Sequence, residues 1–347
     1  MSEKVLEIKD LHVAYRTDDA IVRAVNGLSL SIEAGETVGL VGETGAGKTT
    51  TALSIMKLLP SKIGTVDKGE ILLDGENVLE LGEKKMRLLR GSKVSMIFQD
   101  PMTSLNPVYK IGKQVGEGLR LHRGYSKQEA LKRATELLDL VGIPEPEKRV
   151  NEYPHQFSGG MRQRVMIAMA LACDPDILIA DEPTTALDVT IQAQIIELMQ
   201  EMQEKNGNAI IMITHDLGVV ADMADKIMVM YAGRPVEFGT AEEIFYESRH
   251  PYTWGLIRSI PEQAIDEKKP LTPIHGNPPS LMNLPEGCVF SPRCPYATDK
   301  CRKQRPERVV TESGHYSACH YSGDPEFLKN APETSRTRKD SKKGGEA

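Results

Sequence analysis

Residues 42–49 read Gly42-Glu43-Thr44-Gly45-Ala46-Gly47-Lys48-Thr49 and are the most informative stretch of this chain. They fit the pattern G-x-x-x-x-G-K-[ST], in which the backbone N–H groups of a glycine-rich loop curl around phosphates. An apolar run at 36–41, expected to be a strand, precedes them, and a helix-forming run at 50–59 follows. Lys48 is then expected to reach the β- and γ-phosphates and Thr49 to ligate Mg²⁺. The stretch therefore predicts a nucleotide site.

Two adjacent carboxylates point to the same chemistry. Residues 176–180 are a short apolar run that predicts a buried strand, and Asp181 and Glu182 follow it. Ligands of open α/β sheets bind beyond the carboxyl ends of the strands. We expect Asp181 to hold Mg²⁺, directly or through water, and Glu182 to polarise the water that attacks the γ-phosphate. The alternative is a solvated turn before Pro183.

A third element is Ser158-Gly159-Gly160, which precedes a helical run at 165–173. A serine hydroxyl, free N–H groups and a helix dipole that point one way form an anion-binding niche. In isolation the same residues are an ordinary helix N-cap. Their position about twenty residues before the acidic strand favours a second phosphate-binding element.

The rest of the chain predicts an α/β fold with a mostly parallel sheet. Short apolar strands are expected at 36–41, 94–98, 176–180 and 209–214, separated by loops or helices. Ser126 and Glu129 form a capping box for an amphipathic helix within a helical insertion of about 100–175. The expected units are a nucleotide-binding domain (1–260), a proline-rich cysteine module with little regular structure (261–331) and a disordered tail (332–347).

Composition excludes several classes of protein. The formal charge of −6 and a pI near 5.8 disfavour a nucleic-acid binder. The longest apolar run, 165–173, is too short to cross a bilayer, and no signal segment is expected at the N-terminus. We therefore expect a soluble chain in the reducing cytosol, where its five cysteines are not expected to form disulfides.

Taken in order, these elements resemble the nucleotide-binding subunit of an ATP-binding-cassette (ABC) transporter over residues 5–260. The resemblance implies a P-loop fold, ATP hydrolysis with Glu182, Gln99 and His215 as catalytic residues, and Mg²⁺ held by Thr49, Gln99 and Asp181. One departure is Met161, where many members have Gln. The residues implied to contact ATP are Tyr15, which would stack on adenine, Gly42, Glu43, Thr44, Gly45, Ala46, Gly47, Lys48, Thr49, Thr50, Ser158, Gly159, Gly160 and Asp188.

The resemblance also implies partners. Two cassettes close head to tail, identical or merely similar, so that the Ser158 element of one completes the site built on Lys48 of the other. Residues 155–171, the segment His250-Pro251-Tyr252-Thr253 and the cysteine module resemble the ATPase subunits of oligopeptide and dipeptide importers. This implies two membrane permease subunits, an extracytoplasmic peptide-binding protein and a peripheral position on the cytoplasmic face of the cell membrane. Importers of nickel or other small solutes share most of these marks.

Two rival classes share the phosphate loop. Soluble ABC ATPases of DNA repair insert long coiled coils, whereas only 109 residues separate Lys48 from Ser158 here. A module that binds ATP without hydrolysing it does not require both Glu182 and His215.

Four cysteines, Cys288, Cys294, Cys301 and Cys319, suggest a metal centre that staples the C-terminal module. They are separated by 5, 6 and 17 residues, without the close pairs typical of zinc ribbons. Four thiolates on irregular loops suit a [4Fe–4S] cluster, and similar modules in peptide-importer ATPases resemble iron–sulfur sites. Zinc and free thiols remain the alternatives. Cys173 is expected to be a buried apolar residue.

Overall fold

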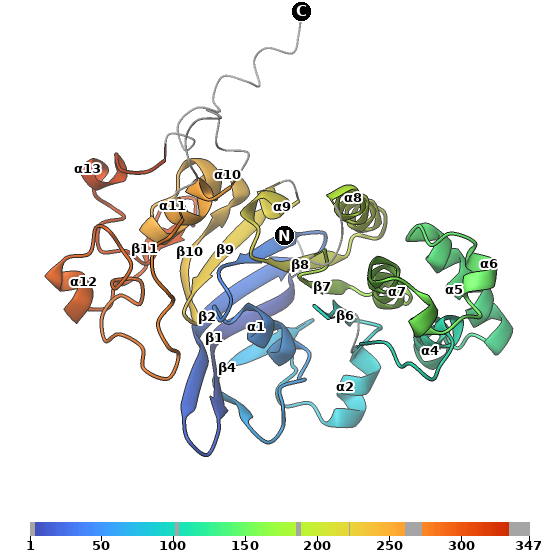
Figure 1. Ribbon diagram of the computed structural model, residues 1–347. Coiled ribbons are helices and arrows are strands. Elements are labelled where there is room, and N and C mark those ends of the chain that lie inside the picture. The colour runs from blue at the N-terminus through green and yellow to red at the C-terminus, as the bar shows by residue number, and fades with distance from the viewer. Residues whose placement is uncertain (1–3, 101–103, 185–188, 222, 261–272, 333–347) are drawn as a thin grey trace, which may run out of the picture.

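The computed structural model describes residues 4–100, 104–184, 189–221, 223–260 and 273–332, and contains two sheets with helices around them (Figure 1). The strands are β1 (Lys4–Arg16), β2 (Ile21–Glu33), β3 (Thr37–Val41), β4 (Gly64–Leu73), β5 (Glu76–Asn77), β6 (Val94–Ile97), β7 (Ile177–Asp181), β8 (Ala209–Thr214), β9 (Lys226–Tyr231), β10 (Arg234–Thr240), β11 (Val309–Val310) and β12 (Tyr316–Ser317). The helices are α1 (Lys48–Ile55), α2 (Glu83–Leu89), α4 (Ile111–His122), α5 (Lys127–Leu140), α6 (Pro146–Arg149), the 3₁₀ helix η1 (Pro154–Gln156), α7 (Gly159–Leu171), α8 (Val189–Asn206), α9 (Leu217–Ala221), α10 (Ala241–Tyr246), α11 (Pro251–Arg258), α12 (Asp299–Lys303) and α13 (Pro325–Leu328).

The larger sheet has the strand order β11-β12-β10-β9-β3-β8-β7-β6. Strands β9, β3, β8, β7 and β6 are parallel, whereas β10, β12 and β11 add antiparallel pairs at one edge. The predicted α/β fold with a mostly parallel sheet is confirmed. Because β3, β7 and β8 are neighbours, the loops that follow them meet at one end of the sheet.

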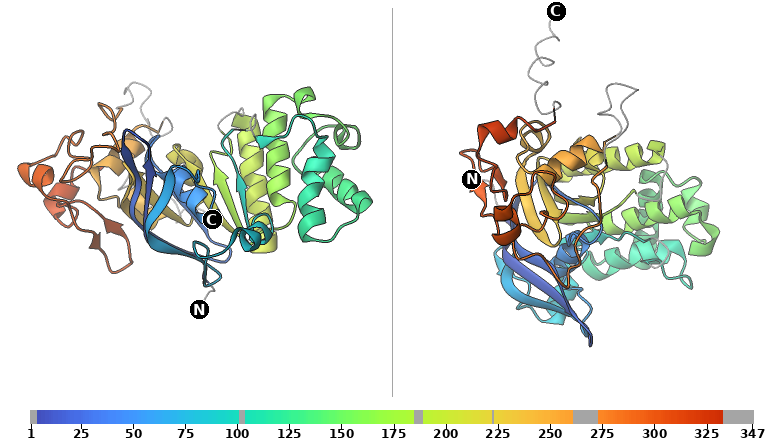
Figure 2. Two further views of the ribbon diagram at one scale, coloured as in Figure 1. Left: turned by 90° about the horizontal axis from the view of Figure 1, so that it is seen from below. Right: turned by 60° about the vertical axis from the view of Figure 1, so that its left-hand side comes forward.

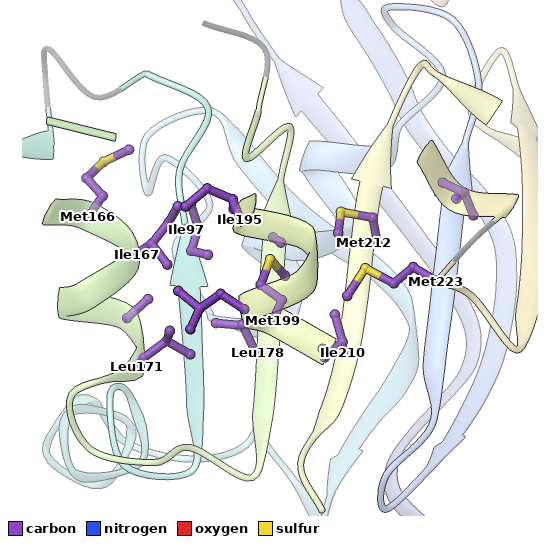
Figure 3. Close-up of a cluster of buried hydrophobic side chains, with 14 of the residues drawn as sticks. Ile97, Met166, Ile167, Leu171, Leu178, Ile195, Met199, Ile210, Met212 and Met223 are labelled. Atoms are coloured by element: carbon purple, nitrogen blue, oxygen red, sulfur yellow. The ribbon is translucent and has the colours of Figure 1, made fainter. Parts of the chain in front are cut away.

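Side chains of the parallel strands alternate between two cores. On β7, Leu178 and Ala180 belong to one buried cluster, and Ile177 and Ile179 belong to the other. Figure 3 shows the first of these clusters, in which α7 and α8 pack against β6, β7 and β8. A strand buried on both faces reads as a continuous apolar run, which explains why the sequence made these strands easy to identify.

A second, antiparallel sheet was not expected from the sequence. It has the order β2-β1-β4-β5, and its long strands β1 and β2 pair from Lys4↔Glu33 to Arg16↔Ile21. Its buried side chains share a cluster with α1 and with one face of the larger sheet. The phosphate-loop helix α1 therefore lies against both sheets.

The helices α4, α5, α6, η1 and α7 lie between β6 and β7 in the chain and form a lobe to one side (Figure 1). The predicted capping box is present: the Glu129 N–H donates to the Ser126 hydroxyl, and the Glu129 carboxylate accepts from the Ser126 N–H. Cys173 is buried, as predicted. Within the described residues, no helix is both long and apolar enough to cross a membrane.

The cysteine module lies on the opposite side of the molecule from the helical lobe (Figure 2). It has little regular structure, as expected, but its strands β11 and β12 join the larger sheet. Glu237 of β10 is paired with Ser317 of β12. The module is therefore continuous with the sheet that carries the phosphate loop. Residues 261–272 and 333–347, which include almost all of the predicted tail, lie outside the described residues.

Candidate nucleotide site

The phosphate loop connects the buried strand β3 to helix α1, as the motif predicts. Gly42 and Gly47 have φ angles of 155° and 100°, values that favour glycine. A Cβ atom at Gly42 would lie 2.1 Å from the Met230 carbonyl oxygen, and one at Gly47 would lie 2.3 Å from that of Ala24. The loop therefore packs against neighbouring backbone at both ends, where a side chain would displace it.

Lys48 lies at the start of α1 with only 7% of its surface exposed. Its Nζ donates to the carbonyl oxygens of Gly42 at 2.5 Å and Glu43 at 3.2 Å. Burial lowers the pKa of Lys48, while nearby carboxylates, Glu182 first, oppose that shift. The amine is thus held within the loop, where a phosphate would meet a cation with few competing water molecules.

Asp181 ends strand β7 and is almost fully buried. Burial raises the pKa of Asp181, and a hydrogen bond with Thr49 opposes that shift. Its Oδ1 atom has no hydrogen-bond partner among the described residues. A buried carboxylate oxygen without a partner, next to a threonine hydroxyl, is a donor set that fits Mg²⁺.

Glu182 lies between the two other polar residues that the resemblance implicates. Its Oε2 accepts a hydrogen bond from Gln99 Nε2 at 2.8 Å, and its Oε1 lies 3.1 Å from His215 Nδ1. The Glu182 backbone has a φ angle of 48°, and its N–H donates to the Ile213 carbonyl of β8. Three segments far apart in sequence therefore bring a carboxylate, an amide and an imidazole together beside the phosphate loop.

Ser158 and Tyr15, which are also predicted to contact ATP, lie in different parts of the fold. Ser158 caps α7, where its hydroxyl accepts from the Met161 N–H at 3.3 Å, and α7 lies in the helical lobe and not beside α1 (Figure 1). Tyr15 is half-buried, and its hydroxyl lies 3.2 Å from Thr50 Oγ1 at the start of α1. Asp188 lies outside the described residues.

Glu43 is bound in a way that the motif does not reveal. Its N–H donates to the Tyr252 hydroxyl at 2.9 Å, and its carboxylate forms an ion pair with Arg293 of the cysteine module. A buried glutamine that the sequence analysis did not single out, Gln163 of α7, donates to the carbonyl oxygen of Pro183 at 2.7 Å. Gln163 lies between Arg162 and Arg164 in the sequence, so no local pattern signalled its burial, and nothing local signalled the partner of Glu43.

The four cysteines of the module line one cavity of about 20 Å³, together with Phe290, Tyr296 and other aromatic residues. All are free thiols. Burial raises the pKa of Cys294 to about 11 and the pKa of Cys319 to about 12. Within the described ranges, no three histidine, cysteine or acidic side chains are grouped so that they could hold a metal ion. The described side chains therefore do not support the predicted metal centre in the C-terminal module.

Comparisons with known proteins identify the family of this chain. The family model "ABC transporter" matches residues 25–185, and "Oligopeptide/dipeptide transporter, C-terminal region" matches residues 236–301. The oligopeptide transport ATP-binding protein OppD of Bacillus subtilis is 54% identical over 90% of this chain and 87% of its own. The dipeptide transport ATP-binding protein DppD of the same organism is 51% identical over 91% of this chain and 94% of its own.

Solved structures give the same fold. The ATP-binding cassette MJ0796, a dimer bound to ADP and Pi in a post-hydrolysis state, matches with a TM-score of 0.62 and 30% identity over 68% of this chain and 98% of its own. The cassette cbiO1 of Clostridium perfringens matches with a TM-score of 0.58 and 30% identity, covering 71% of this chain and 92% of its own. The chain therefore belongs to the ATP-binding proteins of ABC transporters, in the family that contains the oligopeptide and dipeptide transport ATP-binding proteins.

Proposed function

We propose that this chain is the ATPase subunit that dimerises on ATP and powers import of dipeptides or oligopeptides through a membrane permease. The observation that carries the proposal is the similarity to OppD and DppD, which extends over nine-tenths of the chain, together with the match of the oligopeptide/dipeptide C-terminal model to residues 236–301. The grouping of Lys48, Asp181 and Glu182 around the phosphate loop supports the hydrolytic step.

Each residue of the site has a proposed task. Lys48 would neutralise phosphate charge, and Thr49 and Asp181 would hold Mg²⁺, with Gln99 as a further ligand. When bound, Mg²⁺ would supply charge compensation for the phosphates of ATP. Glu182 orients the attacking water and accepts its proton, and His215, which lies 3.1 Å from Glu182, contacts the γ-phosphate.

The remaining contacts come from partners. A second cassette, identical or similar, contributes its Ser158 element to the site built on Lys48, which is consistent with the distance between α7 and α1 in one chain (Figure 1). Two permease subunits hold the ATPase at the cytoplasmic face of the membrane, where Gln99 and the helical lobe make the contact. An extracytoplasmic binding protein delivers the peptide.

The import function predicts that peptide stimulates ATP turnover only in the complete transporter. We expect the full-length chain, reconstituted with the permease and binding protein that co-purify with it, to hydrolyse ATP faster when a short peptide is added. The same preparation without the binding protein is the control, and nickel ions and free amino acids are the competing substrates. Stimulation by nickel and not by any peptide would contradict peptide import while leaving the ATPase function intact.

We further propose that Cys288, Cys294, Cys301 and Cys319 bind a [4Fe–4S] cluster, with zinc as the alternative. All four thiols line one cavity, and thiolates are the ligands that both centres prefer, but the described side chains are not grouped to hold a metal ion as they lie in the structure. The cavity of about 20 Å³ holds about one water molecule, so a cluster would require the surrounding loops to move apart. The centre would order the module and take no part in hydrolysis, which has no redox step.

Anaerobic purification tests the metal proposal. We expect a brown protein with about four irons per chain. The Cys294→Ser variant should lose both iron and the order of the C-terminal module, because that module has few other elements to hold it. Iron content and limited proteolysis are the measurements, and Cys173→Ser, which changes a cysteine outside the module, is the matched control. A colourless preparation with one zinc per chain would overturn the cluster.

A further inference from the structure

The ion pair between Arg293 and Glu43 joins the cysteine module to the phosphate loop across 250 residues of sequence. Arg293 Nη1 donates to Glu43 Oε2 at 2.5 Å, and Nη2 donates to Oε1 at 3.0 Å. The Arg293 side chain is only 4% exposed. Two parallel N–H···O bonds from a planar guanidinium fix the orientation of a carboxylate as well as its distance.

The other donors of Arg293 are also used. Nε donates to the His275 carbonyl at 2.9 Å, Nη2 to the Ile274 carbonyl at 3.1 Å and Nη1 to the Tyr231 hydroxyl at 3.2 Å. With the two bonds to Glu43, each of the five N–H groups has a partner. Two carbonyl groups of the module and one hydroxyl group of β9 therefore hold the guanidinium independently of the phosphate loop.

Glu43 is fixed at three points. Its N–H donates to the Tyr252 hydroxyl, its carbonyl oxygen accepts from Lys48 Nζ, and its carboxylate binds Arg293. The Tyr252 ring packs on Tyr231 and on Phe290, with centroid distances of 4.6 Å and 5.4 Å. The position of Glu43 therefore sets one of the two carbonyl contacts of the Lys48 amine.

The partner residues come from the segment between two of the cysteines. Phe290 follows Cys288 by two residues, and Arg293 directly precedes Cys294. The conformation of this short segment decides both where Phe290 packs and where the guanidinium points. This segment therefore connects the cysteines to the phosphate loop through direct contacts.

We propose that Arg293 is a positioning residue for ATP, which holds Glu43, and through it Lys48, in the geometry that receives the phosphates. The inference rests on the proposed role of Lys48. Without Arg293, the Glu43 carboxylate would leave its place and present an uncompensated negative charge beside the phosphates of ATP. Both changes weaken ATP binding, whereas the groups around Glu182 that act in hydrolysis stay in place.

A double-mutant cycle on the full-length chain tests this proposal. We expect Arg293→Met to raise the Kd of ATP by at least about tenfold. The uncompensated charge of Glu43 would repel the phosphates of ATP, and salt screens such repulsion only beyond roughly 10 Å. The kcat at saturating ATP should change by less than about threefold. The effect should largely disappear in the Glu43→Gln background, where no charge is left unpaired. The matched control is Arg302→Met, which removes an exposed arginine of the same module that pairs with Asp299.

Each outcome decides the question. An ATP Kd for Arg293→Met within twofold of the original chain, or an equal loss in the Glu43→Gln background, would overturn the proposal. If Arg293→Met fails to fold, Arg293→Lys decides, since it keeps the charge but cannot form both bonds to Glu43; an unchanged Kd in that variant also overturns it. Wild-type ATP affinity in Lys48→Ala would instead show that the assigned nucleotide site is wrong.

Discussion

Replacing Glu182 with glutamine is expected to lower steady-state ATP turnover by about 10²- to 10⁴-fold while ATP still binds. Glutamine can accept the hydrogen bond from Gln99 Nε2 and can donate to His215 Nδ1, so the contacts seen around Glu182 persist. What is lost is the negative charge and the basic oxygen. The chain should therefore accumulate as an ATP-bound dimer.

Size-exclusion chromatography with ATP and a phosphate-release assay measure the two effects of Glu182→Gln. Glu136→Gln, which changes an exposed carboxylate of α5 that pairs with Arg133, is the matched control and should behave like the original chain. Hydrolysis at the original rate by the Glu182→Gln protein would show that another group serves as the base.

Replacing Lys48 with alanine is expected to weaken ATP binding by about 10- to 100-fold, since hydrogen bonds to charged groups are among the strongest in proteins. The amine is buried, and the carbonyl oxygens of Gly42 and Glu43 would also lose their donor. Equilibrium binding of ATP is the measurement. Lys57→Ala is the control, because Lys57 donates to the carbonyls of Leu79 and Leu81 at the other end of α1. Equal ATP affinity in the Lys48 and Lys57 variants would refute the assignment.

Local sequence was enough to predict the residues that lie within single strand–loop–helix units. The loop at Gly42–Lys48, the carboxylates at the end of β7 and the capping box at Ser126 each depend on neighbours within a few residues. The helix after the phosphate loop ends earlier than expected, at Ile55, because Lys57 adopts a φ angle of 50° and the chain turns.

Features that depend on long-range packing were not predictable. The antiparallel sheet pairs β1 with β4 across some sixty residues, and β12 joins β10 across about eighty. No pattern near Arg293 or Glu43 marks them as partners, since an arginine before a cysteine and a glutamate in a glycine-rich loop both read as exposed charges. Their pairing follows only from the way the module packs on the sheet.

The contact between Arg293 and Glu43 also has a consequence for synthesis. At about 5–20 residues per second, the 250 residues between them take roughly 12 to 50 s to translate. Throughout this interval the nascent chain carries a complete phosphate-binding motif without its contact to Arg293. The edge of β10 is also open from the time it is made until β12 follows about eighty residues later. The phosphate loop therefore leaves the ribosome before the residue that holds Glu43 has been made. The contact forms only after Arg293 is translated. Premature termination within the cysteine module but before Arg293 would leave a chain that retains every nucleotide motif while Glu43 lacks its ion pair.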